Sequence, residues 1–324
     1  MRRLCAVLLG IAVSLLPVCA QQTFFGGPVE GFTFDLPTQS FRAVIGFAGS
    51  ATFGPALASG FDTGSVAPHA NYGIGFQQGA CVLVSGLDSA QASTAPIAGV
   101  NGQPDGISWA ADGSVAILSS SSANWLQVLT GLPDAPQAGS PVDLSSLGGV
   151  ISAVASDRHG RNIAVAVPGG VLLSSDRQNF VSFFQIAQPK ALAFSQDGAS
   201  LYVLDGSAQQ LDIVAMQDGS FQTLSLDGLQ DAEAVASGRD LQNRQVVYVA
   251  SVSDQIFRAY DPSTQQVLTE FPLDVKPTGV SAFGQYSFII TSRTKPTDPL
   301  WLYTSAPQPA VYFVPAALSS GGLD

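Results

Sequence analysis

The sequence predicts an all-β protein, a single β-propeller of four-stranded blades with seven blades favoured. Hydrophobic residues make up 46% of the 324 residues and charged ones only 11%. Tight polar turns recur at nearly regular intervals, and each lies between two short apolar runs rich in β-branched and aromatic residues. No long helical pattern interrupts them. Evenly spaced short strands of this kind are typical of propellers, in which neighbouring units bury a shared core.

The repeated unit is best seen between Ala191 and Leu204, where the turn Asp197-Gly198 joins two apolar runs. Glycine accepts a positive φ there and aspartate bonds to nearby backbone, so the segment predicts a hairpin. Equivalent turns recur every 38 to 47 residues at His69-Ala70, Asp112-Gly113, His159-Gly160, Gly238 to Asn243 and Phe283-Gly284. A second hairpin follows in each unit, most clearly at Gln255–Leu268 with its turn at Asp261–Thr264.

The ends of the chain are expected to close the ring. Gly31–Val44 has the plan of a second hairpin and predicts the outer half of a further blade, with Gly26-Gly27 as the turn of a degenerate first unit. A strand at Val311–Pro315 is expected to complete this N-terminal blade and leave no unpaired edge. Six blades plus an N-terminal hairpin is the alternative. Leu132–Gly149, rich in Pro, Gly and Ser, is expected to be a long loop.

The first 20 residues predict an export signal, with Arg2 and Arg3, an apolar run and the small-residue end Val18-Cys19-Ala20. Cleavage before Gln21 leaves a propeller domain at 21–316 and a flexible tail at 317–324, in a secreted or periplasmic protein. Lipidation at Cys19 is less favoured, because valine is a poor residue before a modified cysteine. No later run approaches the ~20 apolar residues of a membrane helix, so no stable membrane insertion is expected.

The net charge limits the kinds of partner that the protein can bind, and the cysteine count limits the disulfides that it can form. The chain carries 13 basic and 24 acidic residues, a net charge of −11 that becomes −13 without Arg2 and Arg3. This balance repels nucleic acid and anionic membranes, and it leaves cations, neutral sugars and proteins. Only Cys81 survives signal removal, so no intramolecular disulfide is possible and a thiol in an apolar strand is expected to fill space. We expect a monomer.

The strand residues Leu201–Asp205 and Val247–Ala250, with the turn Asp261–Thr264, resemble the YVTN-type propeller repeats of secreted and periplasmic bacterial proteins. The resemblance is strongest from Ile151 to Phe271 and implies the propeller fold. Such families include binding and scaffold proteins, and related propellers include lactone-hydrolysing enzymes. The resemblance therefore implies an architecture and leaves the activity open.

Motifs for catalysis are scarce. The sequence has no Gly-x-Ser-x-Gly elbow, phosphate-binding loop, His-Glu-x-x-His pair or Asp-rich calcium loop. Its two histidines, His69 and His159, occupy hairpin turns on different blades and are interpreted as solvated turn residues. Trp109, Trp125 and Trp301 are expected to pack between blades rather than to form a sugar platform. No motif in the sequence specifies a metal site or cofactor, and an enzyme is less favoured than a binding protein.

The candidate site is the channel mouth formed by residues that enter each innermost strand and by loops that leave the next one. Its candidate residues are Asp105, Lys190, Asp205, Asp231, Glu233, Thr278 and Arg293. Convergence of Asp105, Asp231 and Glu233 would offer oxygen ligands to a divalent cation such as calcium. Lys190 and Arg293 would then orient an anionic or polar group. The alternative is that these charges are solvated or pair with one another.

Three functions follow from this reasoning. The first hypothesis is a secreted, non-enzymatic propeller that binds a protein or glycan through its loop face. The second is a metal-assisted hydrolase of a lactone or small ester at the channel mouth. The third is a structural subunit of an envelope complex, which should expose an apolar patch on one face.

Overall fold

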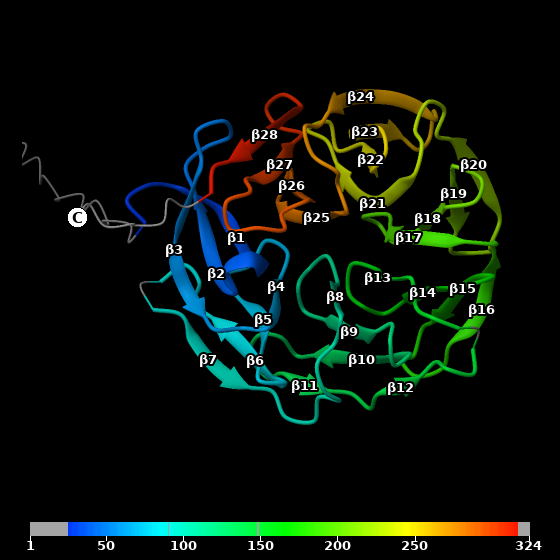
Figure 1. Ribbon diagram of the computed structural model, residues 1–324. Helices are drawn as coiled ribbons and strands as arrows, with labels where there is room; N and C mark the ends of the chain where they lie inside the picture. The colour runs from blue at the N-terminus through cyan, green and yellow to red at the C-terminus, as the bar shows by residue number, and fades with distance from the viewer. Residues whose placement is uncertain (1–24, 90, 148, 317–324) are drawn as a thin grey trace, which may run out of the picture.

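The computed structural model describes residues 25–89, 91–147 and 149–316, and these form a seven-bladed β-propeller (Figure 1). Seven antiparallel sheets are arranged in a ring, as predicted. The predicted signal peptide and the tail from 317 onward lie outside these residues. Within the described ranges, no helix has the length and apolar character needed to span a bilayer.

The strands follow one another blade by blade. Blade 1 contains β1 (Val29–Asp35), β2 (Ser40–Ile45) and β3 (Thr52–Ser59), with the 3-10 helix η1 (Leu36–Thr38) between the first two. Blade 2 contains β4 (Thr63–Val66), β5 (Gly73–Gln77), β6 (Ala80–Ser85) and β7 (Ser93–Pro96). Blade 3 contains β8 (Gly106–Trp109), β9 (Ala116–Ser120), β10 (Trp125–Thr130), β11 (Gln137–Ala138) and β12 (Val142–Asp143).

The remaining blades each have four strands. Blade 4 contains β13 (Ala153–Ser156), β14 (Ile163–Val167), β15 (Gly170–Ser174) and β16 (Val181–Gln185). Blade 5 contains β17 (Pro189–Phe194), β18 (Ser200–Asp205), β19 (Gln210–Ala215) and β20 (Phe221–Ser225). Blade 6 contains β21 (Ala232–Arg239), β22 (Gln245–Ser251), β23 (Ile256–Asp261) and β24 (Gln266–Pro272). Blade 7 contains β25 (Gly279–Gly284), β26 (Ser287–Thr291), β27 (Leu300–Thr304) and β28 (Ala310–Val314).

The predicted inner turns are confirmed, since each joins the two innermost strands of blades 2 to 7. At the turn Asp197-Gly198, Gly198 has a φ of +72°, and Oδ1 of Asp197 accepts the backbone N–H of Ala199 at 3.1 Å. The predicted hairpin turn at Asp261 is confirmed as well, because its Oδ1 accepts the N–H of Ser263 at 2.8 Å. The predicted long loop contains β11 and β12, two short strands that pair with β10 as a broken outer strand.

Two predictions about the ends of the chain are wrong. Segment 31–44 is not an outer half, because β1 is the innermost strand of a three-stranded sheet in the order β1-β2-β3. Nor does Val311–Pro315 complete that sheet, because β28 pairs with β27 in blade 7, with Val311 opposite Tyr303. Val311 also packs against the core between blades 6 and 7, which fixes the strand there. The ring is therefore closed without a shared strand.

Strand β1 runs in the opposite direction to the innermost strands beside it. A Cβ on Gly31, near the start of β1, would meet the ring of Phe283 near the end of β25. Asp35, at the end of β1, instead lies beside Arg293. Arg293 follows β26, and the end of β26 pairs with the start of β25. Innermost strands elsewhere run parallel, as in the contact of Ser237 in β21 with Phe194 in β17. Blade 1 therefore has the strand directions of a blade that lacks its first strand.

The hydrophobic core is divided among seven clusters, one at each interface between neighbouring blades. The five interfaces from blade 2 to blade 7 each contain eleven or twelve buried hydrophobic residues. The two interfaces of blade 1 contain only six and five. Cys81 lies in the cluster between blades 2 and 3, where burial raises its pKa to about 12. Its predicted role as a small apolar filler is confirmed.

Candidate functional site

The two ends of the channel differ in the loops that surround them. The turns between the first and second strands of blades 2 to 7 form one end, here called the turn face. The loops that lead into the innermost strands, and those that follow the second strands, form the opposite end, here called the loop face. All seven candidate residues predicted from the sequence belong to the loop face by their position in the strands.

Three of these candidates meet in one cluster. The Nζ atom of Lys190 lies 2.8 Å from Oδ1 of Asp231 and 2.8 Å from Oε2 of Glu233. These hydrogen bonds, followed by the charges of the two acids, raise the pKa of Lys190 despite some desolvation. The alkyl chain of Lys190 crosses Gly206, where a Cβ would come within 2.7 Å of it. The cluster is thus an ion pair between the innermost strands of blades 5 and 6.

The next three candidates are bound within their own blades. Both carboxylate oxygens of Asp105 accept the N–H of Ser121 at 3.0 Å. Asp205 is buried, and its Oδ1 accepts the N–H and the hydroxyl of Ser207. Thr278 is exposed and donates to the carbonyl of Thr291. The structure therefore does not bring Asp105 together with Asp231 and Glu233. No group of three or more His, Cys, Asp or Glu side chains placed to hold a metal occurs in the described residues.

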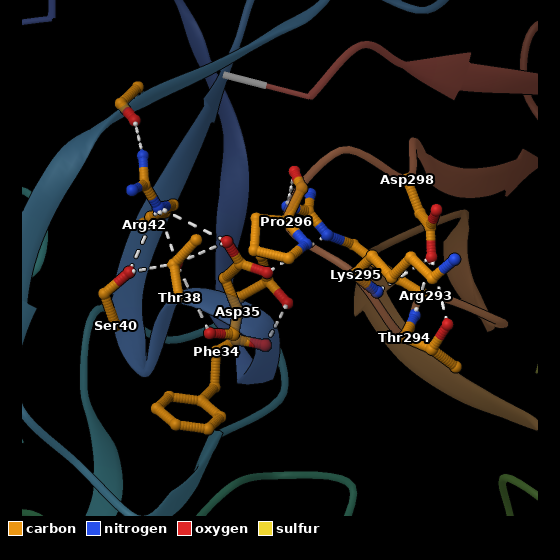
Figure 2. A network of polar contacts seen from close by, with 12 residues as sticks. Phe34, Asp35, Thr38, Ser40, Arg42, Arg293, Thr294, Lys295, Pro296 and Asp298 are labelled. Carbon is orange, nitrogen blue, oxygen red and sulfur yellow. Dashed lines mark hydrogen bonds and ion pairs between the residues drawn. The ribbon is translucent and has the colours of Figure 1, made fainter. Parts of the chain in front are cut away.

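Arg293, the last candidate, belongs to a buried polar network between blades 1 and 7 (Figure 2). Its Nε lies 3.2 Å from Oδ1 of Asp35, and the side chains are 8% and 1% exposed. Arg42 approaches the other oxygen of the same carboxylate, with Nε 3.5 Å from Oδ2. Asp35 therefore lies between two guanidinium groups, one from its own blade and one from the far end of the chain.

The surroundings hold the Arg293 side chain in place. Its Nη2 donates to the carbonyl of Pro296 at 2.7 Å, and its guanidinium carbon lies 4.8 Å from the centre of the Phe53 ring. Asp298 fixes the same loop by accepting the N–H groups of Thr294 and Lys295 (Figure 2). Desolvation by burial is the largest effect on Arg293 and lowers its pKa. The charge is thus held in a site with little water.

A hollow of about 1190 Å³ opens on the turn face, and residues from all seven blades line it. Its polar lining includes His69, Asn71, Arg158, Asp197, Arg239, Asp240 and Gln285. A second hollow of about 550 Å³ follows the channel toward the loop face and includes Asp35 and Arg293. Phe32, Gln196 and Ser237 line both hollows, so the two lie next to each other within the ring.

Several side chains of the turn-face hollow have unusual surroundings. Arg158 is exposed; its carbonyl accepts the N–H of Asp112 at 3.1 Å, but its guanidinium makes no hydrogen bond or ion pair with the described residues. His69 lines the hollow with a φ of +56°; its ring is exposed to water, and partial desolvation by the surrounding turns lowers its pKa. Burial raises the pKa of Glu30, although a hydrogen bond from Tyr312 opposes this. The imidazole of His69 and the unpaired guanidinium of Arg158 therefore line the same hollow.

The seven sheets and the hollows within their ring define the class of this protein as a seven-bladed β-propeller. No protein-family model matches the sequence, and no curated protein matches it. The chain is similar to a solved structure described as a nidogen/laminin complex, at 16% identity and a TM-score of 0.49, over 75% of this chain and 92% of that one. It is also similar to the hydrazine synthase of Kuenenia stuttgartiensis, at 12% identity and a TM-score of 0.48, over 68% and 69%. Similarity at this level says nothing about the ligand or activity of this chain.

The sequence reasoning missed Asp35, Arg42 and Arg158. One signal for the first two was present, because Arg42 interrupts the apolar strand Phe41-Arg42-Ala43-Val44 in a chain with few charges. A charge in such a strand requires a buried partner. Arg158 gave no such signal, since a charged residue in a polar turn is ordinary.

Proposed function

We propose that this protein is an exported, non-enzymatic propeller that binds a protein partner with its turn face. The hollow of about 1190 Å³, lined by every blade, is the observation that carries this proposal. Binding residues concentrate in turns that a rigid scaffold holds in place, because the sequence of such a turn can vary without disturbing the core. The signal-like residues 1–20 support export.

The rim of the hollow has the composition of a protein-binding surface. Arg158 offers an unpaired guanidinium, and Leu241 is 49% exposed. Asp197 and Asp240 place negative charge in the same hollow. Arginine and exposed apolar side chains, surrounded by polar groups of both signs, are the features that anchor protein partners.

A protein partner is favoured over a glycan because the three tryptophans pack or hydrogen-bond outside the turn-face hollow. Trp125 is buried in the core, and Trp109 donates from Nε1 to Ser65 at 2.9 Å. Trp301 packs against Phe313 on the outer strands of blade 7. None of the three lines the turn-face hollow. A glycan site would use such rings as stacking platforms.

No observation favours the other two hypotheses. The carboxylates that the hydrolase would need are bound by Lys190 in one case and by Ser121 in the other. A structural subunit should expose one apolar patch, but the exposed apolar side chains on outermost strands lie on separate blades. These are Val181, Phe221, Val267 and Phe313.

Site-specific photo-crosslinking tests the proposal. A photoreactive phenylalanine analogue is placed at Leu241 on the turn face and, as a matched control, at Val181 on the outermost strand of blade 4, which are 49% and 63% exposed. In extracts of the cells that make the protein, Leu241 should give one discrete crosslinked protein and Val181 should not. Arg158→Glu should remove that product while the melting temperature stays unchanged. Equal crosslinking at both positions, or none at Leu241, would contradict the proposal.

A further inference from the structure

Three arginines, here called the blade 4 arginines, lie in two loops of that blade. Arg158 and Arg161 belong to the inner turn between β13 and β14, and Arg177 belongs to the loop between β15 and β16. The four strands alternate in direction, so both loops lie on the turn face. Nε of Arg177 donates to the carbonyl of Gly160 at 2.8 Å, which brings the outer loop against the inner turn. Since Arg158 lines the turn-face hollow, the three arginines extend outward from its rim.

The guanidinium groups of Arg158 and Arg161 are available to a partner. Both residues are exposed, and neither side chain makes a hydrogen bond or ion pair within the described residues. Five other basic side chains in these residues do pair with carboxylates. They are Arg42, Lys190, Arg244, Arg258 and Arg293, on blades 1, 5, 6 and 7. The ion pairs of the protein therefore leave the arginines of the blade 4 turn unpaired.

Carboxylates in these loops and in the neighbouring turns of blades 3 and 5 do not bind the arginine side chains. Each accepts hydrogen bonds from its own turn or from His159 instead. They are Asp112, Asp157, Asp176 and Asp197. Their charges cancel the long-range attraction of the three arginines. A partner is therefore held here by short charged hydrogen bonds, which require acceptors placed directly against the guanidinium groups.

Both loops are held in place before any partner binds. Gly160 has a φ of +62°, and a Cβ there would come within 2.7 Å of Val115 in blade 3, so the inner turn packs against the next blade. Arg177 has a φ of +68°, a conformation that few residues other than glycine, asparagine and aspartate adopt. Oδ1 of Asp176 fixes it by accepting the N–H groups of the two residues after Arg177. Such positions cluster at binding sites, and loops that are already ordered lose less entropy on binding.

We propose that the blade 4 arginines bind an acidic, extended segment of the protein partner. The inference rests on the proposed function and names the part of the partner that reaches blade 4. The planar fork of N–H donors on a guanidinium matches a carboxylate with two parallel hydrogen bonds. Arginines in two adjoining loops suit several carboxylates along one chain better than a single small acid. A nucleic acid or sulfated glycan is disfavoured, because a chain with a net charge of −11 repels a dense polyanion.

Fluorescence anisotropy on the full mature chain tests the inference with hexaglutamate, capped at both ends and labelled with an uncharged dye. Hexaglutamate should bind, and hexaglutamine with the same label should not. Arg158→Gln and Arg161→Gln should each weaken the binding about two- to fivefold, as expected for exposed charged pairs. The matched control is Arg244→Gln, the same change of charge on the turn face of blade 6, where Arg244 pairs with Asp240. It should leave the affinity unchanged.

A double variant, Arg158→Lys with Arg161→Lys, separates hydrogen-bond geometry from charge. It keeps both positive charges and loses both planar forks, so hexaglutamate should bind nearly as weakly as to the corresponding glutamine variant. Unchanged affinity in the lysine variant would overturn the inference, because the surface would then respond to charge alone. Melting temperatures of all variants should equal that of the unchanged protein, since the replaced side chains are exposed.

The inference is also overturned if hexaglutamine binds as well as hexaglutamate, or if Arg244→Gln weakens the binding as much as Arg158→Gln. A sulfated hexasaccharide that binds more tightly than hexaglutamate through the same arginines would assign the surface to a polyanionic glycan instead. Saturating hexaglutamate should suppress the crosslink at Leu241. A crosslink that persists would overturn this inference alone, whereas hexaglutamate binding without any crosslink would overturn the proposed function alone.

Discussion

The interface between blades 6 and 7 and the interface between blades 7 and 1 use different means to join neighbouring sheets. The first contains eleven buried hydrophobic residues, among them Tyr248, Phe257, Phe288 and Tyr303, whose rings pack within 4.6 to 6.4 Å of one another. The second contains only six, together with the buried pair Asp35–Arg293. The stability of an apolar interface depends on the apolar area that it buries, whereas the stability of a buried ion pair depends on its geometry and on the presence of both partners.

The difference follows from the missing strand of blade 1. A blade with three strands presents less apolar surface to its neighbours, as its two small clusters show. Polar groups fill the place where further apolar side chains would pack. The seam between blades 7 and 1 therefore has one of the two smallest apolar clusters, together with buried polar atoms of Arg293, Asp35 and Glu30 that have no hydrogen-bond partner in the described residues.

The largest expected effect comes from removing apolar volume on the two sides of blade 7. Ile290 and Leu302 are both fully buried, but the first belongs to the cluster with blade 6 and the second to the cluster with blade 1. We expect Ile290→Ala to lower the free energy of unfolding by about 4 kcal/mol and Leu302→Ala by about 2 kcal/mol, because a loosely packed seam collapses more easily around a cavity. Urea unfolding measures both. Equal losses would mean that the seam is packed as tightly as the other interfaces.

The second effect isolates the polar part of the seam. Asp35→Asn leaves two guanidinium groups without their buried counter-charge, so we expect a loss of about 3 kcal/mol in the free energy of unfolding. Its control is Asp231→Asn, whose carboxylate is 46% exposed and whose loss should hardly move the unfolding midpoint. A small loss for Asp35→Asn would show that the pair contributes no stability to the closed ring.

A third, smaller effect is expected at the ion pair between blades 5 and 6. Lys190→Met keeps the alkyl chain over Gly206 and removes the charge, so the loss should be about 0.5 kcal/mol at low salt. In 1 M NaCl the two proteins should become equally stable, because exposed charges are screened. Thermal unfolding at the two salt concentrations measures this. A loss that persists in high salt would mean that the cluster acts through packing.

The smallest effect concerns pH. Because desolvation lowers the pKa of His69, the unfolded chain takes up the proton first as the pH falls. The stabilisation by neutral His69 is therefore complete above the ordinary histidine pKa of about 6.5 and is lost as the pH decreases below it. We expect a loss of less than about 1 kcal/mol between pH 7.5 and 5, since the ring still contacts water. His69→Asn, which tolerates the positive φ, should remove that part of the pH dependence.

The repeating part of the fold could be predicted because its signals are local. An Asp-Gly turn such as Asp197-Gly198 requires only its own neighbours, and the period then places the blades. The ends of the chain could not be placed this way. Gly31–Val44 forms a hairpin whichever two strands of a blade it supplies, and Val311–Pro315 suits the edge of either neighbouring sheet. Which position each segment takes depends on packing across the seam.

The candidate site also has one part that local signals in the sequence predict and one part that they do not. Lys190 and Glu233 stand one repeat apart, so parallel innermost strands bring them together, and pairing was one of the predicted alternatives. Arg293 was predicted as a binding residue, and that role stays a prediction. Its partner Asp35 comes from the opposite end of the chain, and no local pattern relates the two. The choice of loop face over turn face could not be made from sequence, because both faces carry polar residues.

Ring closure without a shared strand has a mechanical consequence. A propeller of repeats behaves as a one-dimensional array in which each unit contacts only its neighbours, and closing it adds one interface to those of the open array. Opening that one interface detaches no blade, because the other six interfaces still hold the array together. A strand exchanged between first and last blades would forbid such an opening. Here no strand pairing joins blades 1 and 7 in the described residues, so side-chain contacts such as that of Asp35 with Arg293 hold the ring closed.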